Sequence, residues 1–108
     1  MSSALGELEI CVLLAALRLD DEAYGVSIRD EIRDRTGRHL SRGAIYSAIT
    51  RLESRGFLDS SLGEPTPVRG GRAKRFFSVT PDGLSAVRTS TNAVDRMREG
   101  LDTLLSGR

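Results

Sequence analysis

The pattern of apolar residues changes at Gly56, and this change limits the possible folds more than any other feature of the sequence. Before Gly56, apolar residues recur every three or four positions, as they do in amphipathic helices. After it come two short segments with the character of strands, the second with paired aromatics. A helical pattern returns at Pro81. We therefore predict a mostly α-helical protein with a small β-hairpin.

The periodicity predicts helices over residues 4–19, 24–36, 42–55 and 81–105, and strands over residues 57–62 and 73–80. Gly37 is a suitable stop for the second helix, Ser41 a good N-cap for the third, and Thr80-Pro81 a typical helix start. With 108 residues the chain can build one core. We assign residues 1–80 to the main domain and residues 81–108 to a C-terminal helix.

Several functional classes are disfavoured by composition. The apolar run at residues 10–17 is too short to span a bilayer. The single Cys11 excludes a disulfide framework, and no signal peptide is recognisable. His39 and Cys11 lie on different predicted elements with no third group nearby, so we expect no enzyme, no metal site and no cofactor. We expect a soluble, cytoplasmic protein.

The net charge of +1 conceals an uneven distribution. Residues 1–40 carry five arginines against eight acids, a balance of −3, whereas residues 41–77 carry six arginines and one lysine against three acids, a balance of +4. Residues 78–108 are neutral, with four of each. Positive charge gathered in the middle third predicts a local anion-binding surface.

The predicted third helix has two distinct faces. One is apolar, and the other carries small or hydroxyl side chains and one tyrosine, with an arginine at each margin and no acid near the start. In a helix-turn-helix this helix enters the major groove. We predict DNA contacts from Arg42, Gly43, Tyr46, Ser47, Thr50 and Arg51. For Gly43 and Ala44 the alternative is that small residues simply permit close helix packing.

The segment "VRGGRAKRFF", residues 68–77, contains four cations, two adjacent glycines and no acid. It could be a solvated loop, but its position between two predicted strands favours a hairpin that grips the DNA backbone. We predict contacts from Arg69, Gly71, Arg72, Lys74 and Arg75. Because strand residues alternate, Arg75 should share a face with Phe77, which we expect in the core. Arg75 is therefore the weakest of these predictions.

Two apolar features suggest a second subunit. The helix at residues 4–19 is apolar on almost every face, which is difficult to bury in a small monomer; the alternative is that it is the central core helix. The C-terminal segment has an apolar seam at spacings of three and four, interrupted by Ser90.

These blocks resemble the PadR family of bacterial transcriptional regulators. The resemblance covers roughly residues 5–84 and rests on Tyr24-Gly25, on the recognition-helix pattern of residues 43–56, and on the glycine-led basic segment of residues 71–83. It implies a winged helix-turn-helix fold and a homodimeric repressor that binds double-stranded DNA. In such a dimer the C-terminal helix of each subunit packs on the first helix of the partner. The resemblance then assigns dimer contacts to Leu5, Leu8, Val12, Val87, Val94, Met97, Leu101 and Leu104.

Three departures from the family pattern are visible. Ser47 stands where many members have proline, and Phe76 and Phe77 replace the usual tyrosines. The chain has no tryptophan, which removes the aromatic sandwich that some drug-binding members use. A flat aromatic effector is therefore not expected, and no other effector is indicated. The alternative function is a winged-helix module that binds a partner protein instead of DNA.

Overall fold

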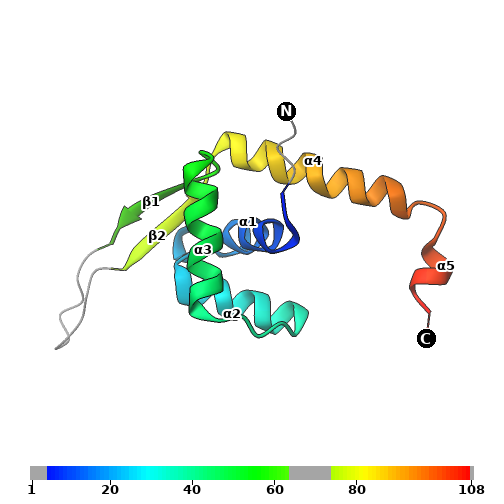
Figure 1. Cartoon of the computed structure of the whole chain (residues 1–108), viewed down its shortest axis with the longest axis horizontal. Coiled ribbons are helices and arrows are strands. Elements are labelled where there is room, and N and C mark those ends of the chain that lie inside the picture. Colours follow the sequence, from blue (N-terminus) through cyan, green and yellow to red (C-terminus); the bar gives the residue numbers. More distant parts are fainter. Residues whose placement is uncertain (1–4, 64–73, 108) are drawn as a thin grey trace.

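The computed structural model describes residues 5–63 and 74–107. It contains α1 (Glu7–Leu19), a 3-10 turn (Asp20–Glu22), α2 (Gly25–Thr36), α3 (Arg42–Ser54), β1 (Leu58–Leu62), β2 (Arg75–Val79), α4 (Pro81–Arg98) and α5 (Asp102–Leu105) (Figure 1). This order confirms the predicted mostly helical fold with a two-stranded hairpin. The helix predicted over residues 4–19 begins at Glu7, and Gly6 is its N-cap.

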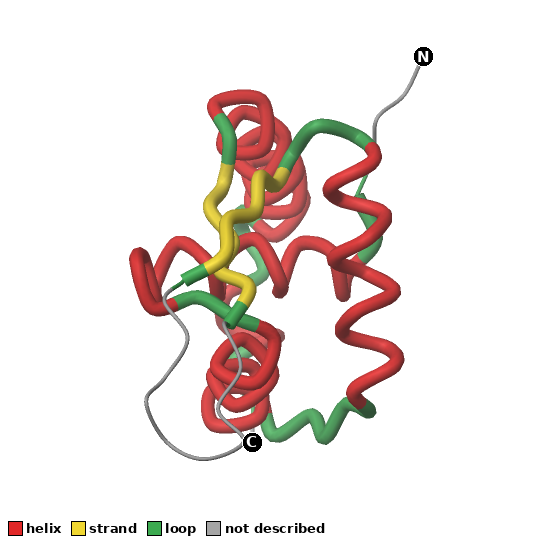
Figure 2. Tube along the Cα trace, turned by 90° about the vertical axis from the view of Figure 1, so that its left-hand side faces the viewer, coloured by secondary structure: helices red, strands yellow, loops and turns green. Residues whose placement is uncertain are grey.

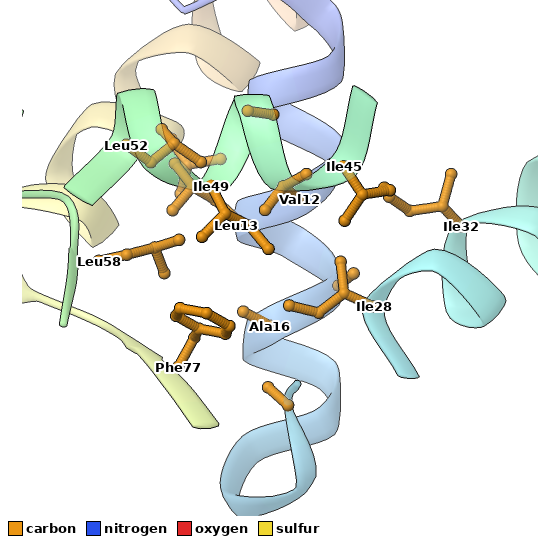
Figure 3. Packing of buried hydrophobic residues seen from close by; sticks show 14 residues of the cluster. Val12, Leu13, Ala16, Ile28, Ile32, Ile45, Ile49, Leu52, Leu58 and Phe77 are labelled. Carbon is orange, nitrogen blue, oxygen red and sulfur yellow. The ribbon is translucent and has the colours of Figure 1, made fainter. Parts of the chain in front are cut away.

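The core lies where α1, α2 and α3 meet (Figure 3). Leu13 of α1, Ile28 of α2 and Ile49 of α3 are almost completely inaccessible to solvent. Each such side chain contributes about 1.5–3 kcal/mol through burial. The spacing of apolar residues along each helix directs one face inward, so the remaining face of α3 is left exposed.

The hairpin closes one side of this core. β1 and β2 are antiparallel, with Leu58 opposite Val79, and Leu58 and Phe77 are both buried against the helices (Figures 2 and 3). The burial of Phe77 was predicted from strand alternation. A contact that was not predicted fixes the hairpin to the start of α2, because the Phe77 N–H donates a hydrogen bond to the carbonyl of Ala23 (2.8 Å).

Two predicted helix starts are formed by side-chain caps. The Ser41 hydroxyl oxygen accepts a hydrogen bond from the Ala44 N–H (3.0 Å), and the Thr80 hydroxyl oxygen accepts one from the Gly83 N–H (3.0 Å). The Thr80 hydroxyl also donates to the carbonyl of Gly56 (2.6 Å). Thr80 therefore starts α4 and at the same time ties it to the end of α3.

The C-terminal segment differs from the single helix predicted over residues 81–105. α4 ends at Arg98, and the separate short helix α5 begins at Asp102. The break occurs at Gly100, whose φ of 84° lies in the left-handed region that other residues rarely adopt. Leu101 and Leu104 are consequently not on the α4 helix, and the predicted straight seam is interrupted.

The outer part of α4 leaves the core and extends away from the body of the protein, with α5 at its far end (Figure 1). Val87 is buried, whereas every described residue from Asn92 onward is exposed. Met97 is 78% exposed, which is unusual for so large an apolar side chain. The chain thus presents an apolar projection that its own fold does not cover.

Candidate nucleic-acid interface

The outward face of α3 is the centre of the candidate site. Gly43, Tyr46, Ser47 and Thr50 lie opposite the buried face of the same helix, and all four are exposed. Arg42 is exposed at the first position, and the first turn contains no acid. Free N–H groups at the start of a helix and a nearby arginine favour a phosphate. The outward face of α3 is thus the polar face expected from the sequence.

Tyr46 has a packing role that sequence reasoning did not find. Its side chain lies over Gly25 at the start of α2, so closely that a β-carbon on Gly25 would overlap the tyrosine ring and hydroxyl. The two residues meet where α2 and α3 pack together, with Arg29 and Arg42 nearby. Tyr46 is still 41% exposed. It can therefore position α3 and also offer its outer edge to a ligand.

Ser47 and Arg51, both predicted DNA contacts, are bonded to each other. Arg51 donates from Nη1 to the Ser47 hydroxyl oxygen (2.8 Å) and from Nε to the carboxylate of Glu9 (3.3 Å). The Arg51 side chain remains 52% exposed. Glu9 belongs to α1 and is distant in sequence, so helical periodicity alone could not reveal this contact.

The cations of the hairpin differ in their surroundings. The Lys74 ammonium lies 4.2 Å from the centre of the Tyr24 ring, and Tyr24 in turn packs edge-on against Phe76. Arg75 instead pairs with Glu53 of α3 (3.0 Å) and lies over the Phe77 ring. The contact of Arg75 with DNA stays a prediction. The other predicted hairpin contacts, Arg69, Gly71 and Arg72, lie outside the described residues.

A further group of basic residues adjoins the start of α3. Arg29, Arg33 and His39 line an open hollow of about 210 Å³ beside the turn between α2 and α3. Asp30 lies 3.8 Å from Arg29 and 3.3 Å from Arg33, so part of this charge is balanced locally. No sequence pattern indicated this group, because acids and arginines alternate along α2.

The residues predicted for dimerisation fall into three sets. Val12 and Val87 are buried inside the single chain, where they belong to its core rather than to a free surface. Leu5 and Leu8 are partly buried and pack against that core. Four residues of the C-terminal segment are exposed: Val94, Met97, Leu101 and Leu104.

Two further searches cover only the described part of the chain. Within residues 5–63 and 74–107, no three histidine, cysteine or acidic side chains come together in a way that could hold a metal ion. In the same ranges, none of the helices is both long and apolar enough to cross a bilayer.

Two packed helices, a third helix with an exposed polar face and an antiparallel hairpin together define a winged helix-turn-helix. The hairpin is the wing. Residues 13–89 match the transcriptional regulator PadR-like family, and the chain belongs to this family.

Individual relatives agree with this assignment. The chain is 32% identical over 78 residues to the transcriptional regulator Rv3488 of Mycobacterium tuberculosis, covering 72% of this chain and 68% of the relative. A PadR family regulator from Clostridium difficile has a similar structure, with a TM-score of 0.73, 23% identity, and coverage of 93% and 99% of the two chains. A regulator from Clostridium thermocellum has a TM-score of 0.72 at 22% identity, covering 89% and 87%.

Proposed function

We propose that this regulator is a homodimeric repressor that binds a pseudo-palindromic operator through α3 and the wing. The observation that carries the proposal is the exposed outward face of α3, which has hydroxyl groups, one aromatic edge and no acid in its first turn. A helix of this kind can approach base edges without repelling the phosphates. Its partner would be double-stranded DNA in the cytoplasm.

Major-groove contacts are proposed for α3, and contacts with the flanking backbone or minor groove for the wing. In α3 the residues are Arg42, Gly43, Tyr46, Ser47, Thr50 and Arg51. In the wing they are Arg69, Gly71, Arg72 and Lys74, with a smaller part for Arg75 because Glu53 already neutralises it. The first group would determine which sequence is bound, and the second would supply affinity that does not depend on sequence.

The homodimer is supported by the uncovered apolar side chains of the C-terminal segment. Val94 and Met97 project from α4 beyond the body of the protomer, and Leu14 and Leu17 of α1 are 41% and 42% exposed. A two-fold arrangement would bury both surfaces, because each subunit supplies one and receives the other. Two recognition helices would then meet half-sites about 34–36 Å apart.

The proposal is tested by selecting bound duplexes from fragments of the source genome, followed by mobility-shift titration at several salt concentrations. We expect one enriched inverted repeat. If the dimer makes about 6–10 phosphate contacts, its affinity should fall roughly 10³- to 10⁵-fold between 50 and 200 mM salt. Increased transcription from a bound promoter in the presence of the protein would contradict the repressor role.

The alternative, a module that binds protein rather than DNA, predicts a different result. Such a protein would show no enrichment of any duplex and no shift at modest salt. It would also leave the four cations of residues 68–77, a segment without an acid, without a role.

A further inference from the structure

Glu9 is the one buried charged side chain within residues 5–63 and 74–107. It lies in the first turn of α1 and is 8% exposed. A carboxylate in such a place is costly unless other groups compensate its charge. The groups that do so explain what Glu9 contributes.

The two carboxylate oxygens of Glu9 have different partners. Oε1 accepts a hydrogen bond from the N–H of Gly6 (2.8 Å), just before α1, and lies 3.7 Å from Nη1 of Arg55. Oε2 accepts from Nε of Arg51 (3.3 Å). One carboxylate thus joins the start of α1 to Arg51 of the recognition helix and to Arg55 just after that helix.

Arg51 is held at two of its nitrogens. Nε donates to Glu9, and Nη1 donates to the hydroxyl of Ser47, one turn earlier on α3. Because the guanidinium group is planar, bonds at two nitrogens fix both its position and its plane. The side chain is nevertheless half exposed. An arginine fixed in this way is already ordered before it meets a ligand, so less conformational freedom is lost on binding.

We propose that Glu9 is a positioning residue for DNA recognition: it does not contact DNA, but it holds Arg51 so that the exposed edge of the guanidinium reads the operator. The proposal rests on the proposed function and extends it to a residue outside the DNA-binding face. It makes Arg51 a contributor to sequence discrimination rather than a general source of positive charge.

The test compares Glu9→Gln with Glu7→Gln. Both substitutions remove one negative charge from α1, but Glu7 is 83% exposed and pairs with Arg38, which precedes α3, rather than with Arg51. Affinity is measured for the selected operator and for a scrambled duplex of equal length. We expect Glu9→Gln to reduce the ratio of the two affinities roughly tenfold, within the range of one bidentate base contact. Glu7→Gln should leave the ratio within about twofold of its original value, since its partner lies elsewhere.

Arg51→Lys supplies the second arm, because it keeps the charge but loses the planar fork. If Glu9 acts through Arg51, Glu9→Gln should cause little further loss of discrimination in the Arg51→Lys background. A purely structural role would lower the melting temperature and leave the affinity ratio unchanged. Glu9→Asp keeps the charge on a shorter side chain. If Glu9→Gln does not fold, a reduced ratio with Glu9→Asp supports the proposal and an unchanged ratio overturns it.

Three results would overturn the proposal. The first is an unchanged ratio in folded Glu9→Gln protein, and the second is an equal reduction in Glu7→Gln. The third is tighter binding of both duplexes by Glu9→Gln, which would mean that Glu9 opposes DNA binding. If the unsubstituted protein binds no duplex, the proposed function fails and this inference fails with it.

Discussion

Tyr46 of α3 covers Gly25 of α2 so closely that no β-carbon fits between them. Gly25 is the first residue of α2 and is buried, while Tyr46 retains an exposed outer edge. The pair sets how near the start of the recognition helix lies to the preceding helix. It also gives the exposed tyrosine a structural reason that is independent of DNA.

Gly25→Ala should therefore destabilise the protein, although alanine is the better helix former. The added methyl group would displace Tyr46 or separate the helices, at a cost of about 1–3 kcal/mol in the free energy of unfolding. Urea denaturation followed by circular dichroism measures this. Gly43→Ala is the control, because its β-carbon would meet only the Ser41 hydroxyl oxygen, at 4.0 Å. In a Tyr46→Ala background the cost of Gly25→Ala should decrease, and an unchanged cost would contradict the packing role.

Lys74 and Arg75 are neighbouring cations of the wing with different surroundings. Lys74 lies over the Tyr24 ring, whereas Arg75 is paired with Glu53. We expect Lys74→Gln to weaken binding to operator and scrambled duplexes equally, and to reduce the salt slope by about 0.9 for each phosphate that is no longer neutralised. Arg75→Gln should have a smaller effect on this slope. If both variants reduce the salt slope equally, the ion pair between Arg75 and Glu53 must break when the protein binds DNA.

Charge placed on the projecting part of α4 should prevent dimer formation. Val94→Glu combined with Met97→Glu would place two carboxylates on the surface proposed to bind the partner. We expect sedimentation velocity to show a monomer and mobility shifts to show a large loss of operator affinity. Asn92→Glu, an exposed polar position on the same helix, is the control. A double variant that remains dimeric would exclude this surface as the main interface.

Cys11 provides a test at alkaline pH. Burial, the largest cause, raises the pKa of the Cys11 thiol; Arg38 acts in the opposite direction, and Glu7 raises the pKa further. The unfolded chain therefore loses the proton first, at a pH of about 8.5. The folded state is therefore favoured by the protonated Cys11 thiol below that pH, and this contribution to the free energy of unfolding is lost as the pH rises toward the folded-state pKa. The free energy of unfolding should fall more steeply above a pH of about 8.5 than in Cys11→Ala. If the free energy of unfolding depends on pH in the same way in both proteins, the pKa of Cys11 is not raised.

The elements predicted correctly depend on residues close together in the chain. The N-caps at Ser41 and Thr80 use N–H groups three residues away. Phe77 was placed in the core because strand residues alternate between faces. The end of α4 at Arg98 was missed because the spacing of apolar residues continues past Gly100, while the backbone there turns through a positive φ. The spacing of apolar residues predicts which side chains are buried, but it does not predict where a helix ends and the chain changes direction.

The sequence by itself determined the order of helices and strands, the apolar face of α3 and the family of this protein, since each depends on periodic spacing or on short motifs. The tertiary structure alone decided which polar side chains became partners. Glu9 and Arg51 are 42 positions apart, and Arg75 and Glu53 are 22 apart. Their pairing depends on how the helices and the hairpin pack against one shared core. No local pattern of residues encodes that packing, so the side chains available to DNA could be distinguished only after the chain had folded.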